Sequence, residues 1–284
     1  MKFSETDLIL NPDGSVFHLH LTPSMVSDKI ILVGDPDRVP RVSKYFSKIE
    51  AKMARREFVT HTGTFEGKRL TVISTGIGTD NVEIVLTELD ALFNIDLKKR
   101  EALKIKKSIS LVRVGTSGSL RKEIEIGSHL YSSTAMGLDE LVSFYAFKSS
   151  IRDRQLCAAL QAHTALPARP YLVRASRSLS QSMTEGMISG NTITCAGFYA
   201  PQGRKLRVTT RYPKLLHDLG SFDYDGFQLT NFEMETSAIY ALAGLYGHQA
   251  LSLNAIIAGR AVGKFASDPD RIVDDLIIKA LERI

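Results

Sequence analysis

The sequence has few cysteines and no long apolar run, and both features narrow the classes of protein that it can encode. Its two cysteines, Cys157 and Cys195, lie in unrelated contexts without a CxxC spacing, which argues against a disulfide framework or a zinc site. No apolar run reaches the roughly 18 residues of a membrane span, and the N-terminus lacks the pattern of a secretory signal. We therefore expect a cytoplasmic protein without a membrane segment.

The sequence also lacks an extended cluster of charges of one sign. The 284 residues include 36 Lys and Arg against 31 Asp and Glu, a formal net charge of +5. The basic residues are scattered, whereas a nucleic-acid-binding surface has a basic stripe interleaved with aromatics. We expect no nucleic-acid partner. Because no Pro- or Ser-rich linker divides the chain, we expect one domain over residues 1–284, with 1–16 as an N-terminal extension.

Short apolar runs followed by glycine turns recur through the first half of the chain. Lys29–Gly34 and Arg69–Ser74 have the pattern of buried strands, and Asp80–Leu92 has the apolar spacing of a helix. Ser108–Val114 is a third buried run, which we expect to be broken by Gly115–Gly118.

The second half continues this alternation of strands and helices, which predicts a single three-layer α/β/α domain. A helix is expected over Glu235–Leu245. A final helix is expected after Ser267–Asp270, which supplies an N-cap and a proline in the first turn. Further strands are predicted near Gly127–Ser132, Tyr171–Arg174, Asn191–Ala196 and Asn254–Ala258.

Three glycine-rich segments lie at predicted strand ends: Gly34–Arg38, Thr75–Gly78 and Arg113–Gly118. Glycine lets backbone N–H groups approach an anion there. Arg113 is a charged residue inside an apolar run, so it needs either a ligand or a structural ion pair. No segment matches GxGxxG or the phosphate loop GxxxxGK[ST], which indicates a small anion such as phosphate rather than a dinucleotide or ATP.

Two acids flank a methionine before the predicted second-half helix. The carboxylates of Glu233 and Glu235 can accept from the hydroxyls of a cis-diol, and the thioether of Met234 can lie against a ribose face. Either glutamate can instead be a partner for the helix dipole.

An aromatic residue, an amide and a guanidinium lie within one short segment. Phe198 can stack on a base, and Gln202 matches an edge that carries one N–H beside one C=O, with Arg204 close by. Taken singly, Phe198 fits a core position, and Gln202 and Arg204 fit the surface.

Together these segments resemble the nucleoside phosphorylase family, in its branch with the hexameric type of subunit. The likeness runs from Phe17–His20 to the last helix. Its motifs are Gly34–Arg38, Arg56–Phe58, Ser74–Gly78, Arg113–Gly118 and Phe232–Glu235. The resemblance implies a central mixed, partly barrel-like β-sheet.

The resemblance also implies where phosphate and ribose bind. Phosphate is expected at Gly34, Arg38, Arg113 and Thr116, with Arg56 reaching in from a neighbouring subunit. Ribose is expected against Met234, Glu235 and Thr116, with His18 supplied across a dimer. The base is expected beside Phe198, Gln202, Arg204, Gly118, Glu233 and Ile257.

The implied reaction is phosphorolysis of a nucleoside, with Arg38, Arg113 and Arg204 as catalytic residues and phosphate as co-substrate. Purine-cleaving members of the family use an aspartate after a late strand to protonate the base, and the corresponding Ile256–Arg260 has no acid. This favours uridine as substrate. A purine nucleoside phosphorylase, a nucleosidase and a non-catalytic nucleoside-binding protein remain alternatives.

Assembly and ions follow from the same resemblance. A homodimer is expected as the smallest active unit, and the complete assembly is either this dimer or a hexamer built as a trimer of dimers. No cofactor is required. Some members bind a monovalent cation such as K⁺ at the dimer interface, where Glu57, Ile77 and Asn81 would correspond.

Overall fold

The computed structural model describes residues 1–284, and its main feature is one mixed sheet of eleven strands. The strands follow the order β15-β14-β8-β10-β13-β7-β1-β4-β3-β2, with β9 paired to β8, and β5–β6 and β11–β12 form two small sheets. The strands are β1 (Lys29–Val33), β2 (Lys48–Arg55), β3 (Phe58–Phe65), β4 (Lys68–Ser74), β5 (Ile95–Asp96), β6 (Glu101–Ala102), β7 (Ser110–Ser119), β8 (His129–Gly137), β9 (Tyr171–Arg174), β10 (Ile188–Thr194), β11 (Asp223–Tyr224), β12 (Phe227–Gln228), β13 (Asn231–Glu233), β14 (Gln249–Gly259) and β15 (Lys264–Phe265).

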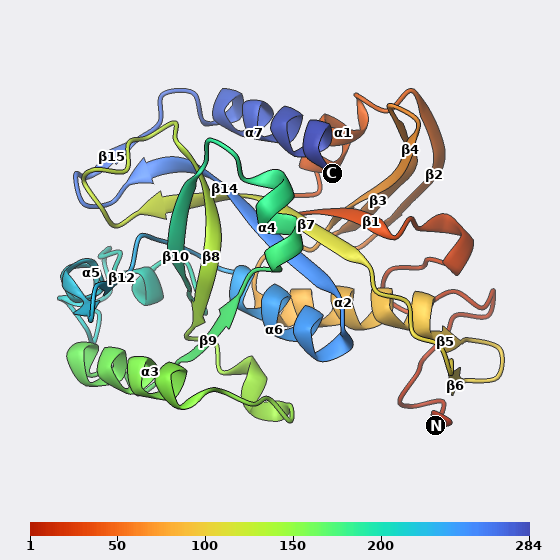
Figure 1. Ribbon diagram of the computed structural model, residues 1–284, viewed down its shortest axis with the longest axis horizontal. Coiled ribbons are helices and arrows are strands. Elements are labelled where there is room, and N and C mark those ends of the chain that lie inside the picture. Colours follow the sequence, from red (N-terminus) through yellow and green to blue (C-terminus); the bar gives the residue numbers. More distant parts are fainter.

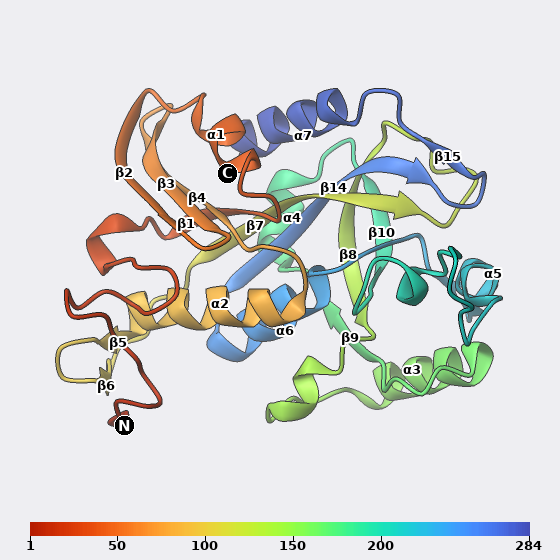
Figure 2. The ribbon, with the colours of Figure 1, turned by 180° about the vertical axis from the view of Figure 1, so that it is seen from behind.

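Helices cover both faces of the sheet (Figure 1), as the sequence predicts. α2 and α6 pack together on one face, and α1, α4 and α7 pack on the other. Figure 2 shows the same two layers from behind. The helices are α1 (Arg38–Ser43), α2 (Thr79–Asn94), α3 (Ile151–Thr164), α4 (Arg177–Met183), α5 (Leu215–Ser221), α6 (Thr236–Tyr246) and α7 (Pro269–Arg283), with short 3₁₀ turns η1 (Pro23–Met25), η2 (Leu141–Phe144) and η3 (Ala200–Gln202).

Strand β1 shows why three layers form. Successive side chains of a strand point to opposite faces, and every residue from Ile30 to Val33 is apolar and buried. Ile30 and Leu32 belong to the core beneath α2 and α6, whereas Ile31 and Val33 belong to the core beneath α7. The apolar run thus serves two cores at once, as buried parallel strands do.

Part of the sheet closes on itself. β14 pairs with β8 at one edge and with β7 at the other, and β8, β10, β13 and β7 are joined in succession. Five strands therefore form a barrel-like ring, which confirms the partly barrel-like mixed sheet that the resemblance implies. The remaining strands extend the sheet beyond β7.

The predicted break in the third strand is wrong. β7 continues through Gly115–Gly118 and ends at Ser119. β14 pairs with it in parallel along this stretch, and β13 pairs with it at Gly118 and Ser119. The glycines are held in extended conformation because partner strands satisfy their backbone groups on both edges.

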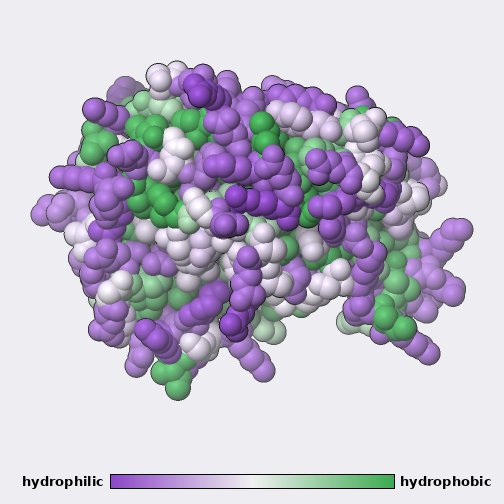
Figure 3. Space-filling model, turned by 45° about the horizontal axis from the view of Figure 1, so that its top comes forward, coloured by the Kyte–Doolittle hydropathy of each residue, from purple (hydrophilic) through white to green (hydrophobic).

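The C-terminal helix begins as predicted. The side chain of Asp268 accepts a hydrogen bond from the backbone N–H of Arg271 at 3.0 Å, and Pro269 is the first helical residue. The apolar face buries Val273, Leu276, Ile277, Ala280 and Leu281 against the sheet. Around α7 the surface is mostly hydrophilic, with separate apolar areas between (Figure 3).

Residues 1–16 pack against the body of the chain. The backbone N–H of Ala102 donates to the carbonyl of Met1 at 2.9 Å, and Leu8 and Val16 are buried in the core that contains α2.

The two cysteines, Cys157 and Cys195, are buried and free. No helix has the length and apolar character that crossing a bilayer requires.

Candidate active site

A cleft of about 620 Å³ opens where β1, β4 and β7 run parallel toward their carboxyl ends. Ligands of such sheets bind at this edge, and the volume suits a small molecule. All the predicted site residues except His18 and Arg56 line the cleft, namely Gly34, Arg38, Glu57, Ile77, Asn81, Arg113, Thr116, Gly118, Phe198, Gln202, Arg204, Glu233, Met234, Glu235 and Ile257.

Arg113 has the ion pair that the sequence left open as one of two alternatives. Its Nη2 lies 2.6 Å from Oε2 of Glu235 and 3.2 Å from Oε2 of Glu233, and its Nη1 donates to Asn254 Oδ1 at 3.0 Å. Burial alone would lower the pKa of Arg113, but the two carboxylates outweigh it and raise this pKa. The guanidinium therefore stays charged while buried inside the sheet.

Gly115 gives Arg113 the space that it needs. The two residues share one face of β7 because they are two positions apart. A Cβ atom at position 115 would lie 2.0 Å from Nη1 of Arg113 and 2.3 Å from its Cζ. The absence of a side chain at Gly115 thus lets the arginine fold back along its own strand.

Arg38 is the second guanidinium at this end of the cleft, and it is incompletely paired. Its Nη1 donates to the carbonyl of Val114 at 3.3 Å, whereas its Nε is buried without a hydrogen-bond partner. Burial, and then the nearby charge of Arg113, lowers the pKa of Arg38. A buried donor without a partner is costly, so this end of the cleft is suited to an anion.

Two glutamates at the start of α6 are held differently. Glu235 accepts from Arg113 and from the backbone N–H of Gly78 at 2.9 Å, and burial followed by Glu233 raises its pKa against the opposing effect of Arg113. Glu233 accepts from Thr194 Oγ1 at 2.7 Å and from the N–H groups of Glu235 and Thr236 at 2.9 Å each. Protein donors thus already engage both oxygens of Glu233.

Another part of the cleft lining has an aromatic ring and a guanidinium in contact. The guanidinium carbon of Arg204 lies 3.6 Å from the centre of the Phe198 ring, and its Nη1 donates to Gln202 Oε1 at 2.5 Å. Burial, and then the charge of Arg260, lowers the pKa of Arg204 to about 10.

Arg260 lies behind this part of the cleft, against the lining residues Gln202, Phe232 and Gly118, and sequence reasoning missed it. Its Nη2 donates to the carbonyl of Gln202 at 3.3 Å, and its Nη1 is buried without a partner. Its guanidinium also lies 5.1 Å from the Phe232 ring centre, and its aliphatic stem lies beside Gly118. Sequence reasoning considered Ile256–Arg260 for its lack of an acid, although its arginine was the available signal.

Glu57, Ile77 and Asn81 line the rim of the cleft. The amide of Asn81 donates to the carbonyl of Ile77 at 3.2 Å, and the side chain of Ile77 is largely exposed. No group of three or more His, Cys, Asp and Glu side chains is arranged to hold a metal ion. Whether these three residues bind a cation stays a prediction.

His18 and Arg56 lie outside the cleft. His18 follows the N-terminal extension and pairs with Glu88 on α2. Arg56 occupies the turn between β2 and β3 with a positive φ of 54°. Their predicted roles therefore need a second copy of the chain.

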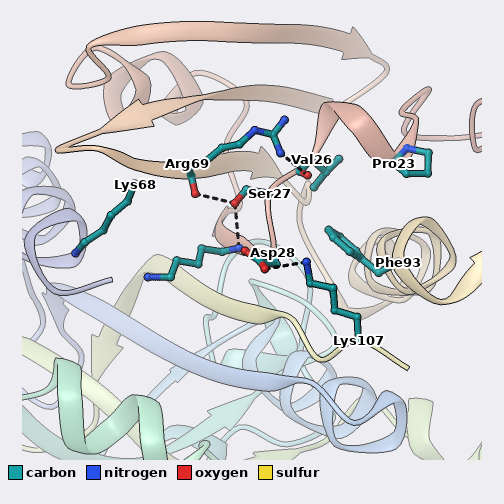
Figure 4. Close-up of a pocket in the computed structure, with 9 residues that line it drawn as sticks. Pro23, Val26, Ser27, Asp28, Lys68, Arg69, Phe93 and Lys107 are labelled. Carbon is teal, nitrogen blue, oxygen red and sulfur yellow. Dashed lines mark hydrogen bonds and ion pairs between the residues drawn. The ribbon is translucent and has the colours of Figure 1, made fainter. Parts of the chain in front are cut away.

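A separate cleft of about 490 Å³ lies beside the start of β1 (Figure 4). Most of its cations have partners: Lys107 lies 2.9 Å from Asp28, Lys68 donates to the carbonyl of Ile284 at 2.8 Å, and Arg69 pairs with Glu50. No residue that lines this second cleft has a buried donor without a partner, as Arg38 has in the first cleft.

Comparison with known proteins gives consistent matches over nearly the whole chain. Residues 28–282 match the model of the phosphorylase superfamily. A uridine phosphorylase of Thermococcus kodakarensis is 28% identical over 93% of this chain and 84% of its own length. A DeoD-type purine nucleoside phosphorylase of a Geobacillus species is 26% identical over 93% of this chain and 96% of its own.

A solved structure agrees with these sequence matches. The crystal structure of a Trypanosoma brucei nucleoside phosphorylase, described as showing uridine phosphorylase activity, superposes with a TM-score of 0.87 at 28% identity. It covers 98% of this chain and 100% of its own. A uridine phosphorylase of Phytophthora capsici, 21% identical over 100% of this chain and 98% of its own, shares the fold with a TM-score of 0.71.

Proposed function

This chain belongs to the phosphorylase superfamily, and on that premise we propose that it catalyses the reversible phosphorolysis of uridine to uracil and ribose 1-phosphate. Inorganic phosphate is the co-substrate, and the proposed chemistry needs no further cofactor. The support comes from a cleft that is lined by the guanidinium groups of Arg38, Arg113 and Arg204 and by the buried carboxylate of Glu235.

Phosphate occupies the end of the cleft at Arg38 and Arg113. The unpaired Nε of Arg38 supplies a donor for a phosphate oxygen, and Arg113 contributes charge beside it. Glu235 and Met234 hold the ribose. A phosphate oxygen attacks the anomeric carbon as the bond to the base breaks, and the electron pair of that bond leaves with the base. Positioning and electrostatic stabilisation carry the rate enhancement.

The part of the cleft that we expect to hold the base, beside Arg204, favours uridine over a purine nucleoside. Arg260 lies close enough to Arg204 for its charge to contribute, after burial, to lowering the pKa of Arg204, and no acid occurs in Ile256–Arg260 to protonate a leaving purine. Uracil leaves as an anion whose charge these guanidiniums stabilise. The absence of an acid in Ile256–Arg260 is the single observation on which the preference for a pyrimidine rests.

A homodimer is the smallest active unit in this proposal, and three dimers can form a hexamer. His18 and Arg56 lie outside the cleft of their own chain, so each would serve the cleft of a neighbour. A K⁺ ion at Glu57, Ile77 and Asn81 would then lie at the contact between subunits.

Absorbance-monitored cleavage of uridine and inosine, each with and without phosphate, tests the proposal. We expect phosphate-dependent loss of uridine alone. Cleavage of inosine would indicate a purine nucleoside phosphorylase, and phosphate-independent cleavage a nucleosidase. Binding of uridine without cleavage would indicate a nucleoside-binding protein.

A further inference from the structure

Glu88 holds His18 through both the ring and the backbone. Oε1 of Glu88 lies 2.7 Å from Nδ1 of His18 and accepts from its backbone N–H at 2.8 Å, and Oε2 accepts from the N–H of Leu19 at 2.8 Å. The Glu88 side chain is 14% exposed and that of His18 is 28% exposed. One carboxylate on α2 therefore fixes the segment and the ring that it carries.

This contact determines which ring nitrogen bears the proton. An ionised carboxylate accepts hydrogen bonds but cannot donate them, so Nδ1 of His18 must carry the hydrogen. In the neutral ring Nε2 is then the acceptor, because the hydrogen bond made by one nitrogen sets the tautomer of the other. Nε2 has no hydrogen-bond partner within the chain.

The backbone next to His18 leaves the ring little freedom to turn away. Leu19 and Leu21 are buried in the same core as α2, and Phe17 packs edge-on against the His18 ring with centroids 4.9 Å apart. The ring of His18 is therefore held in place while its second nitrogen has no partner in the chain and its side chain is 28% exposed.

We propose that Glu88 is a positioning residue, which fixes the tautomer and direction of His18 so that Nε2 accepts a hydrogen bond from a sugar hydroxyl of the nucleoside bound by the neighbouring subunit. This inference rests on the proposed function, in which His18 serves the neighbour's cleft. Glu88 itself touches no substrate.

The chain offers a matched control. His20 makes the same kind of contact, with Nε2 3.0 Å from Oδ2 of Asp13, but Asp13 is exposed. Here the carboxylate engages Nε2 and not Nδ1. Asp13→Asn therefore removes a carboxylate–histidine contact two residues away without changing His18.

The experiment compares Glu88→Gln, His18→Ala and Asp13→Asn in uridine phosphorolysis, with deoxyuridine analogues that each lack one sugar hydroxyl. We expect Glu88→Gln and His18→Ala each to lower kcat/KM roughly tenfold, the effect of one lost hydrogen bond. Both should lose the discrimination against the same analogue, and Asp13→Asn should behave like the wild type. Ring ¹⁵N chemical shifts should show Nδ1 protonated in the wild type and a changed tautomer in Glu88→Gln.

Heterodimers purified through two different tags separate a positioning role from a local structural one. Glu88→Gln paired with Arg38→Ala should recover one intact site, because the Arg38→Ala subunit supplies a correctly held His18. Glu88→Gln paired with His18→Ala should recover none.

Each failure has a different meaning. Wild-type kinetics in His18→Ala would remove His18 from the site and overturn that part of the proposed function. Impaired His18→Ala together with wild-type kinetics and ring shifts in Glu88→Gln would overturn the positioning role alone. Recovery with His18→Ala but not with Arg38→Ala would place Glu88 at its own subunit's cleft, which also overturns it.

Discussion

The side chains of Arg113 and Glu235 form a buried ion pair, with Nη2 2.6 Å from Oε2. One of these residues is expected to meet phosphate and the other ribose. The pair therefore joins two parts of the cleft that the proposed reaction must fill together, and changes at either residue should affect both stability and activity.

Arg113→Ala should abolish phosphorolysis and lower the free energy of unfolding by about 3–5 kcal/mol, because it leaves buried carboxylates without their counter-charge. Urea unfolding at neutral pH measures the loss. Lys107→Ala breaks a pair with Asp28 in which both side chains are about half exposed, and it should cost less than about 1 kcal/mol. Equal losses in the two variants would contradict the structural role of Arg113.

Arg38→Met should raise the KM for phosphate roughly 10- to 100-fold, the effect of losing one or two charge-assisted hydrogen bonds. Stability should change little, because Nε of Arg38 has no partner and the side chain loses a single hydrogen bond, from Nη1 to the carbonyl of Val114 at 3.3 Å. Arg41→Met is the control, since Arg41 lies on the same helix but pairs with Asp270 and Asp274. An unchanged phosphate KM in Arg38→Met would remove this residue from the phosphate site.

Arg260→Met should lower kcat for uridine at least tenfold, because one donor for the leaving base is lost. The loss should be smaller for 5-fluorouridine, whose base is the more stable anion. Steady-state kinetics with the two nucleosides measure this difference. If both slow equally, Arg260 contributes to packing and not to stabilisation of the leaving base.

Stability should fall as the pH drops below about 6.5, the ordinary pKa of histidine, and His129 should account for part of the fall. Its Nε2 is bonded to the carbonyl of Ile272 and its Nδ1 accepts from Lys279 at 3.0 Å. Burial lowers the pKa of His129, so the unfolded chain takes up the proton first. The stabilisation is complete above the unfolded pKa and is lost as pH falls through the folded pKa.

Urea unfolding between about pH 5 and pH 8, on either side of the histidine pKa, measures this dependence. His129→Gln should show a shallower decline than the wild type. A decline of the same slope in both proteins would assign the acid sensitivity to other groups.

Local sequence patterns predicted the parts of the fold that depend on local chemistry. The apolar run from Ile30 to Val33, followed by a glycine turn, indicated a buried strand, and Asp268 with Pro269 indicated the start of α7. The extension of β7 could not be predicted in the same way. Glycines between apolar residues indicate a turn, and the strands that hold them extended come from residues more than 100 positions later.

The sequence predicted which residues line the cleft better than it predicted how these residues contact one another. The sequence pointed to Arg113 but could not supply its partner, because Glu235 lies 122 residues away and meets it only through the fold. The lone guanidinium of Arg260 was overlooked since its meaning depends on Gln202 and Phe232. Resemblance supplied His18 without indicating that Glu88 would hold it.

The close fit of Arg113 over Gly115 has a consequence for anyone who sets out to change this protein. A saturation library at position 115 should return glycine alone among active clones, since even a methyl group would displace the guanidinium. In the loop from Phe198 to Arg204, Gly203 is restricted in the same way, because its φ is +68° and a Cβ there would lie 2.9 Å from the backbone nitrogen of Leu216, whereas Phe198 and Tyr199 are exposed. Substitutions meant to change the base preference should therefore be made at the exposed residues of that loop, and Arg113 and Gly115 should be kept.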